Sequence, residues 1–289
     1  GQMRAQSYQT VAHGADTIQF FQLRRSVGGC EKFHGAVIAH AGTADTRVFR
    51  EVTQLGKELE KIGSRVMGSE NHAKVGIIFD WENYWALEYT SGPNCDLRYV
   101  DQIEQMYNYF YNKNIAVDMI PIDADFSKYD LVAAPVLYMV KDGVAESLEA
   151  YVQAGGTLIT TYMSGIVGQS DNVHLGGYPG PLRKMAGVWV EEIDALAPEQ
   201  RNKIRFADGT EEECRLVCDL MHLEGAEEIA QYESDFYAGM TAVAKNQFGK
   251  GTVYYVGTDL SESGLAKVLA MAADSAAIQP VIGEATALE

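Results

Sequence analysis

The apolar residues of this chain follow two patterns, and the change between them falls near residue 70. Before it, the spacing predicts a short helix over residues 3–14, a strand over 17–23 and a long helix starting at Asp45, a good N-cap residue. Apolar residues of the long helix recur at helical intervals: Val48, Phe49, Val52, Leu55, Leu59 and Ile62. These elements form one unit of a repeating β/α architecture, which is too small to close a core alone.

From Lys74 onward, apolar runs alternate with helical patterns. Strands are expected at residues 75–79, 116–122, 131–138 and 157–161, and helices at 97–112, 144–154 and 264–277. A glycine-rich loop is expected at 164–181, and a hairpin from 241–246 to 252–256. Strand–helix–strand units of this size predict right-handed crossovers and an α/β fold with a mostly parallel, doubly wound sheet.

Composition and charge exclude several classes of partner. The chain has 289 residues, of which 47% are hydrophobic, and its net charge is -17. Such a negative surface repels phosphate backbones and anionic lipid heads, so no nucleic acid and no membrane partner is expected. The sequence contains no apolar run near the ~20 residues that a membrane helix needs. A neutral substrate such as a sugar is compatible with this charge.

The four cysteines, Cys30, Cys95, Cys214 and Cys218, do not have the spacing of a disulfide framework. Reduced thiols and a cytoplasmic location are the simpler interpretation, and no secretion signal is visible at the N-terminus. Cys214, Cys218 and His222 recur every four residues and could share a helix face, but a metal there needs a fourth ligand. Small side chains in a mixed segment are the alternative, and we expect neither a metal nor a cofactor.

Asp80, Trp81 and Glu82 follow the expected strand at 75–79. In an open α/β sheet, ligands lie beyond the carboxyl ends of the strands, so two carboxylates beside a tryptophan could bind a sugar there. The same residues could equally cap a helix or lie at a subunit contact.

Two residues could act as nucleophiles. Cys30 would need a base nearby, and none is assigned. In amidotransferase-type domains the nucleophilic cysteine lies in a glycine-flanked turn after a strand. The comparable turn here, residues 160–165, contains no cysteine, and Ser164 in it has no evident base. These observations disfavour a hydrolytic triad in the second part of the chain.

Glu31 and His34 are three residues apart. On a helix they would share one face, as in carboxylate-bridged metal bundles, but the second pair that such a centre requires is missing. In a loop they could hydrogen-bond sugar hydroxyls. Spacing alone favours an ordinary surface or core role. Of the adjacent Phe20 and Phe21, one could pack in the core and the other stack on a sugar ring, or both could be core residues.

Several ordered segments resemble the β-galactosidases of glycoside hydrolase family 42. Residues 12–24 (AHGADTIQFFQLR), 30–37 (CEKFHGAV) and 46–52 (TRVFREV) are similar to the region around the last strand of the catalytic barrel. Residues 79–88 (FDWENYWALE), 246–251 (NQFGKG) and 254–258 (YYVGT) are similar to the beginning and end of the following domain. The resemblance covers nearly the whole chain.

The resemblance implies a domain organisation. Residues 1–70 would be the C-terminal remnant of a catalytic TIM barrel, ending with its last β/α unit. Residues 71–280 would be a flavodoxin-like or class I glutamine amidotransferase-like domain that mediates trimer formation, and 281–289 the start of a C-terminal β domain. The family hydrolyses terminal β-D-galactosides with retention, which requires two carboxyl groups about 5–5.5 Å apart.

The resemblance also implies which residues touch substrate. Glu31 and His34 resemble the residues that hold galactose hydroxyls, and Phe21 an aromatic residue of the same pocket. Both catalytic glutamates of the family lie on earlier barrel strands and have no counterpart here, so we expect no catalytic residue and no hydrolysis from these 289 residues alone. Many relatives carry Trp where this chain has Leu23, which changes the nearby pocket wall.

Two further interpretations remain at this point. A stand-alone amidotransferase-like or sugar-sensing α/β binding module is the alternative to the enzyme. Independently of the family, aromatic residues lie in or beside polar segments, and a helix cannot turn all of Tyr107, Tyr109 and Tyr111 into one core. Exposed aromatic surface often marks an interface, so we expect self-association. The other residues of this set are Trp81, Tyr84, Trp85 and Tyr89.

Overall fold

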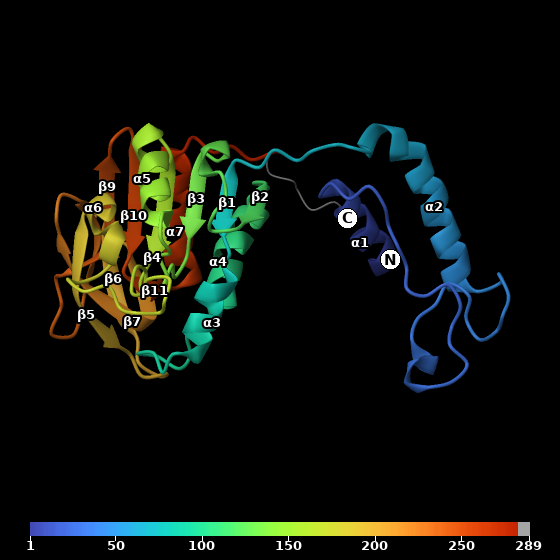
Figure 1. Ribbon diagram of the computed structural model, residues 1–289, viewed down its shortest axis with the longest axis horizontal. Helices are drawn as coiled ribbons and strands as arrows, with labels where there is room; N and C mark the ends of the chain where they lie inside the picture. Colours follow the sequence, from blue (N-terminus) through green and yellow to red (C-terminus); the bar gives the residue numbers. More distant parts are fainter. Residues whose placement is uncertain (283–289) are drawn as a thin grey trace. The chain divides into compact units, whose positions relative to one another are not determined.

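The computed structural model describes residues 1–282 and divides into two compact units (Figure 1). Unit 1 is Gly1–His72 and unit 2 is Ala73–Glu289, so the division falls two residues after the predicted one. The expected start of a further β domain at 281–289 lies, from residue 283 on, outside the described residues. No helix in the described part of the chain is both long enough and apolar enough to cross a membrane.

Unit 1 contains two α-helices and one short 3-10 helix: α1 (Gln2–Ala12), η1 (Cys30–Phe33) and α2 (Arg47–Val66). The predicted N-cap of the long helix was wrong by one residue. The Thr46 hydroxyl, not Asp45, accepts the Phe49 N–H at 3.3 Å and so satisfies a free donor of the first turn. Glu58 of α2 joins the two α-helices because it accepts hydrogen bonds from Arg4 and Tyr8 of α1.

The strand predicted over residues 17–23 does not form. The nearest ladder contact is an isolated parallel bridge between Arg24 and Ile38, just after the segment. A strand is stabilised by a continuous series of hydrogen bonds to a neighbouring strand, whereas here two carbonyls at the end of the segment, those of Gln22 and Leu23, accept N–H groups from Val37 and Ile38. The sequence therefore has strand propensity here without a sheet to join.

Unit 2 is built on a single sheet of eleven strands (Figure 1). They are β1 (Val75–Ile78), β2 (Val117–Ile120), β3 (Leu131–Ala134), β4 (Thr157–Thr161), β5 (Val188–Ala195), β6 (Asn202–Phe206), β7 (Glu211–Leu223), β8 (Glu227–Tyr232), β9 (Thr241–Phe248), β10 (Gly251–Val256) and β11 (Thr258–Leu260). The predicted hairpin is confirmed, because β9 and β10 pair antiparallel across the glycine turn.

The expectation of a mostly parallel sheet was wrong for half of the strands. The spatial order is β11-β7-β6-β8-β9-β10-β4-β3-β1-β2, with β5 paired to β7. The neighbours β2, β1, β3, β4 and β10 pair parallel, and helices connect β1 to β2 and β3 to β4. The other strands pair antiparallel and follow one another through turns. Unit 2 is therefore a mixed α/β domain, of which one half consists of β/α units.

Helices cover both faces of the sheet. α3 (Trp81–Tyr89), α4 (Tyr99–Asn112) and α7 (Glu262–Ser275) pack on one face, whereas α5 (Val144–Ala154) and α6 (Arg183–Ala186) pack on the other. Short 3-10 helices η2 (Phe126–Lys128) and η3 (Gly180–Leu182) lie in the connections. This two-sided cover accounts for strands that are apolar throughout, as in β1.

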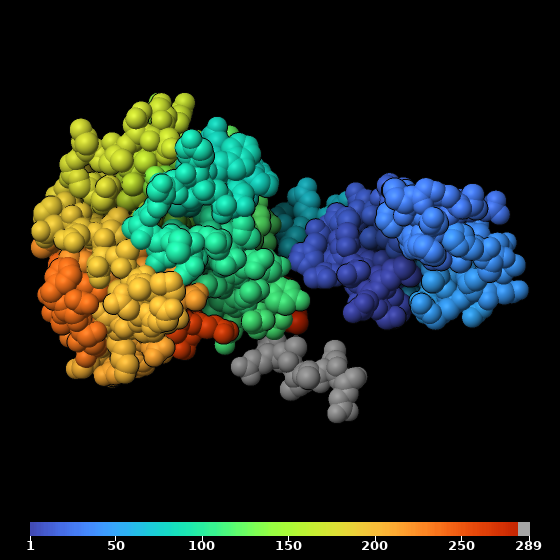
Figure 2. Space-filling model, turned by 90° about the horizontal axis from the view of Figure 1, so that it is seen from below, coloured from blue at the N-terminus to red at the C-terminus, as the bar shows by residue number. Residues whose placement is uncertain are grey.

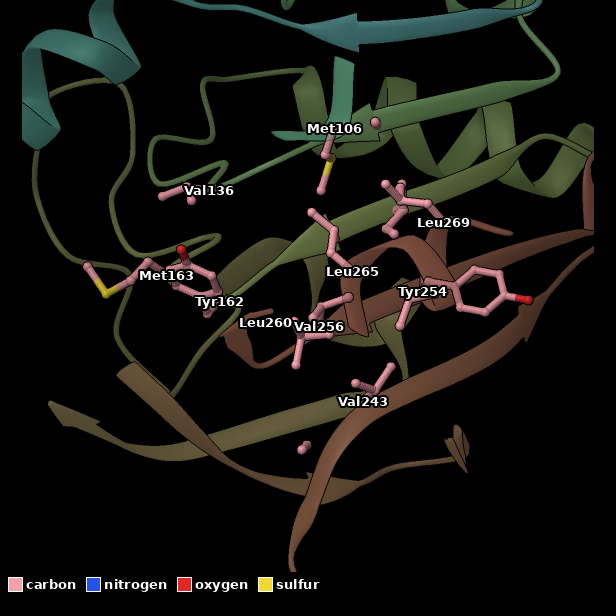
Figure 3. Packing of buried hydrophobic residues seen from close by; sticks show 14 of the residues in the cluster. Met106, Val136, Tyr162, Met163, Val243, Tyr254, Val256, Leu260, Leu265 and Leu269 are labelled. Carbon is pink, nitrogen blue, oxygen red and sulfur yellow. The ribbon is translucent and has the colours of Figure 1, made fainter. Parts of the chain in front are cut away.

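Successive residues of each parallel strand point to opposite faces of the sheet, so their side chains belong to two separate hydrophobic cores. On β10, Tyr254 and Val256 face one cluster while Val253 and Tyr255 face the other. In the space-filling view, the side of unit 2 that faces the viewer is a continuous surface of packed atoms (Figure 2). In the first cluster, Met106 of α4, Leu265 and Leu269 of α7, and Val256 gather against one another (Figure 3). Unit 2 thus has a closed interior.

Candidate functional site

The loop of unit 1 brings the three predicted substrate-binding residues together. The His34 and Phe21 rings are 6.4 Å apart between centroids and meet edge to face at 77°. The His34 Nδ1 lies 3.9 Å from the Glu31 Oε1, too far for a hydrogen bond but within reach of a common ligand. All three side chains are exposed. An aromatic edge, a carboxylate and an imidazole therefore face solvent at one place.

Backbone contacts hold this arrangement. Gly29 has φ +71, a left-handed conformation that suits glycine, and turns the chain into η1. The His34 N–H donates to the Glu31 carbonyl at 2.9 Å, which closes the 3-10 turn. The Val37 N–H donates to the Gln22 carbonyl at 3.0 Å and ties the far end of the loop to the segment that carries Phe21. The three side chains thus project from a loop whose backbone is held in place by hydrogen bonds.

The site can bind hydroxyl groups. A carboxylate accepts hydrogen bonds from two hydroxyls, and a neutral imidazole can donate one and accept another. The ring of Phe21 offers an apolar surface next to them. Cys30, also exposed, precedes Glu31. Leu23 is an exposed aliphatic residue and adds apolar surface without a ring.

At the carboxyl edge of the parallel strands in unit 2, Asp80 caps a helix. Its Oδ2 accepts the Asn83 N–H at 3.1 Å at the start of α3, and its Oδ1 accepts the Lys141 ammonium at 2.8 Å. Glu82 also pairs with Lys141. Burial opposes the charge on Lys141, but the hydrogen bonds that its ammonium donates to both carboxylates outweigh this effect and raise its pKa. The helix-cap alternative for Asp80 is confirmed, and its carboxylate is fully engaged.

Loops held by buried side chains occupy the rest of this edge. Asn83 is fully buried, donates to the Val136 carbonyl at 3.0 Å and accepts the Met139 N–H at 2.8 Å. Ser164 is also buried, accepts the Leu137 N–H at 3.0 Å and lies 2.8 Å from the Thr160 hydroxyl. The Ser164 hydroxyl therefore fixes a loop, and among residues 1–282 it makes no hydrogen bond to a basic side chain. The geometry disfavours a nucleophile at the place where an amidotransferase would have one.

The predicted helix face of Cys214, Cys218 and His222 does not exist, because all three lie on strand β7. The two cysteines are buried, and the neighbouring Cys218 together with burial raises the pKa of the Cys214 thiol. His222 is half exposed, stacks on Trp189 at 4.9 Å and hydrogen-bonds the Glu191 carboxylate at 2.6 Å. Among residues 1–282, no group of three or more His, Cys, Asp or Glu side chains gathers as a metal site.

Sequence reasoning did not predict a buried carboxyl group, Asp219, in the centre of unit 2. Burial raises its pKa to about 7, partly offset by the Tyr255 hydroxyl, which donates to its Oδ2 at 2.7 Å. Its Oδ1 is buried without a hydrogen-bond partner among the described residues. In the sequence, Asp219 is a single charged residue between the apolar neighbours Cys218 and Leu220. This interruption of an apolar run is the signal from which a buried carboxyl group could have been predicted.

The geometry and the sequence both match known families. The profile described as "Beta-galactosidase trimerisation domain" matches residues 73–279, and the one described as "Beta-galactosidase" matches residues 1–62. The chain therefore belongs to the family-42 glycoside hydrolases of the β-galactosidase type. It covers the end of the catalytic domain and the trimerisation domain.

Individual relatives support this assignment. A β-galactosidase of Lactobacillus acidophilus is 53% identical over 268 residues, which are 93% of this chain and 40% of that protein. The crystal structure of β-galactosidase from Bacillus circulans sp. alkalophilus matches with a TM-score of 0.95 and 47% identity over 98% of this chain and 43% of the other. That from Rahnella sp. R3 matches with a TM-score of 0.91 and 45% identity over 96% and 42%. The chain spans about two fifths of the length of these relatives.

Proposed function

We propose that this chain is part of an enzyme that hydrolyses terminal β-D-galactosides with retention. Membership of the family supports this function. The main structural support is that the side chains of Phe21, Glu31 and His34 lie close together in one loop. Glu31 and His34 hydrogen-bond the galactose hydroxyls, and Phe21 forms the apolar wall beside them. Residues 73–282 hold three copies of the enzyme together.

The fold of unit 2 supports an assembly role and disfavours a second catalytic site. Its parallel half, with helices on both faces, supports the proposed relation to class I amidotransferase-like domains. The edge where such enzymes bind substrate is here occupied by Asn83, Ser164 and the Asp80–Lys141 pair. A stand-alone amidotransferase-like enzyme therefore has less support than a non-catalytic association domain.

Hydrolysis by residues 1–289 alone is not expected under this proposal. Retention requires a nucleophile and an acid/base residue on opposite sides of the glycosidic bond, and the resemblance assigns both to barrel strands without counterpart in these residues. Glu31 is left to bind rather than to react. The purified chain should release no chromophore from a chromogenic β-galactoside above the rate of buffer. Turnover at the rate of an ordinary glycosidase would refute this part of the proposal.

The role of Glu31 can be tested in the full-length enzyme. Glu31→Ala should lower kcat/KM by about 100-fold, because hydrogen bonds to sugar hydroxyls strengthen in the transition state. The melting temperature should stay unchanged, since the side chain is exposed and supports no buried group. Glu60→Ala, an exposed carboxylate on α2, serves as the matched control. A Glu31→Ala enzyme that melts early but keeps its specific activity would point to a structural role.

A further inference from the structure

Helix α3 has an aromatic face that unit 2 does not cover. Trp81, Trp85 and Tyr89 are four residues apart and lie on one side of the helix, with 59%, 58% and 90% of their surfaces exposed. The opposite side is buried, since Ala86 packs in the core and Asn83 is fully enclosed. Glu82 and Glu88 of the same helix are exposed as well, so three large aromatic side chains reach solvent beside two carboxylates. Exposed aromatic surface of this kind often marks an interface. In the space-filling view, the turquoise segment with α3 lies at the surface of unit 2 (Figure 2).

The exposed rings rest on a rigid aromatic base. Trp81 meets Phe79 edge to face at 4.8 Å and lies 6.1 Å from Trp85. Beneath them, Tyr84 stacks on Tyr99 at 6.3 Å, and Phe79 lies 5.7 Å from Tyr99. Rings held in this way lose little conformational entropy when a partner covers them. Preorganised tryptophan and tyrosine residues are the typical energetic centre of a protein interface.

Charge indicates which surface covers this face. Unit 2 has 14 basic and 33 acidic residues, a net of -19, whereas residues 1–72 have 9 basic and 7 acidic residues, a net of +2. Glu82 and Glu88 lie on α3 itself, and the nearby Lys141 is already paired with Asp80 and Glu82. Two such faces would therefore repel each other. A less acidic surface is the complementary one.

Symmetry leads to the same conclusion. The proposed assembly of three copies is a closed ring, and every contact in a ring of three joins two different surfaces. A face that pairs with itself would give a dimer. The aromatic face of α3 must therefore meet a different part of the neighbouring copy.

We infer that the α3 face, made of Trp81, Trp85 and Tyr89, docks on residues 1–72 of a second copy of this chain. This inference rests on the assembly role proposed above and assigns the contact surface. Aromatic anchors supply the buried area, and the charge difference between the two parts of the chain sets which surface they meet.

The test compares the wild-type chain with Trp81→Ala/Trp85→Ala by sedimentation velocity over a concentration series. The double variant should raise the dissociation constant of the trimer by about tenfold or more. Phe236→Ala removes an aromatic that is 70% exposed elsewhere in unit 2 and should leave assembly unchanged. A variant trimer as tight as wild type overturns the inference but leaves the proposed assembly standing. A wild-type chain that stays monomeric at tens of micromolar overturns both.

A second measurement covers the case in which the double variant fails to fold. Tyr89 is almost fully exposed, so replacing it with a photo-crosslinking amino acid leaves the core untouched. In a mixture of isotope-labelled and unlabelled chains, crosslinks between copies should join position 89 to peptides from residues 1–72. Crosslinks only to peptides from residues 73–289 overturn the assigned partner surface.

Salt provides an independent readout of charge complementarity. Raising ionic strength from about 50 to about 500 mM screens surface charges. Attraction between the acidic α3 surroundings and a less acidic surface should then weaken, so the wild-type trimer dissociates more readily. Tighter association at high salt would mean that two acidic surfaces meet, and would overturn the inference.

Discussion

Units 1 and 2 differ most in how much of each is enclosed. Of residues 1–72, all of which the structure describes, only Ser7, Ala36 and Leu55 are buried. Unit 2 encloses two apolar clusters, one on each face of its sheet. Both units contain an amphipathic helix with a side-chain N-cap, α2 in unit 1 and α7 in unit 2. The difference shows that an amphipathic helix with a cap does not by itself form a hydrophobic core. A second layer of structure must cover its apolar side.

The same contrast applies to polar groups. In unit 1, Glu58 is partly buried, and hydrogen bonds from Arg4, Gln54 and Tyr8 lower its pKa to about 2. In unit 2, Asp219 is enclosed, and burial raises its pKa to about 7. A carboxylate that accepts several hydrogen bonds and still reaches water keeps its charge, whereas an enclosed one is driven toward the neutral form.

Separating the two units should reveal the largest difference between them. Residues 73–282 alone should unfold in one cooperative transition, because they contain both apolar clusters. Residues 1–72 alone should show no transition, since the area they bury cannot offset about 1.5 kcal/mol of conformational entropy per ordered residue. Calorimetry on both segments checks this. A cooperative melting peak from residues 1–72 would show that they fold unaided.

Deleting one buried side chain should affect only unit 2. Leu269 of α7 is fully buried in the first cluster, and Leu269→Ala should lower the free energy of unfolding by about 3 kcal/mol. The matched change in unit 1, Leu59→Ala on the half-exposed side of α2, should lower it by less than about 1 kcal/mol. Urea unfolding of the full chain measures both. Equal losses would mean that residue 59 is covered as fully as residue 269.

The buried carboxyl makes unit 2 sensitive to pH. Because the folded-state pKa of Asp219 is raised, the folded state holds a proton that the unfolded chain releases above pH of about 4. Stability should therefore fall as pH rises, until the folded group ionises near 7. Between pH 5 and pH 8 the wild type should lose about 2 to 3 kcal/mol more than Asp219→Asn.

Glu58→Gln is the control for this experiment. The lowered pKa of Glu58 means that its contribution is complete above about 4.5 and is lost only at more acidic pH. Its substitution should leave the slope of stability between pH 5 and pH 8 unchanged. Parallel curves for wild type and Asp219→Asn would show that the carboxyl is hydrated in the folded protein.

Removing a helix cap should have the smallest effect on the free energy of unfolding. Asp80→Ala removes the cap of α3 and one partner of Lys141, and should cost about 1 kcal/mol in the unfolding of unit 2. Thr46→Ala removes the cap of α2 in unit 1 and should leave that transition unchanged. Chemical denaturation monitored by tryptophan fluorescence checks both, since all three tryptophans lie in unit 2. A cost for Thr46→Ala would indicate that the two units unfold together.

The sequence predicted correctly those helices and strands whose start and end are marked by residues within the element or next to it. The helix Val144–Ala154 and the strand Thr157–Thr161 have the predicted bounds, because a double glycine and an apolar run mark them in the sequence. The antiparallel strands between residues 188 and 232 were not predicted. Asp208-Gly209, a typical hairpin turn between β6 and β7, was their clearest available signal.

The sequence alone was enough for the family, the amphipathic helix α2 and the β9–β10 hairpin, and it predicts Phe21, Glu31 and His34 as substrate-binding residues. Tertiary structure decided what depends on partners distant in the chain. Residues 17–23 have strand propensity but no strand to pair with, Ser164 is enclosed between loops, and Cys214 and His222 lie on a strand where helical spacing does not apply. Hydrogen-bond partners and burial are set by contacts over long sequence separations, which no local pattern encodes.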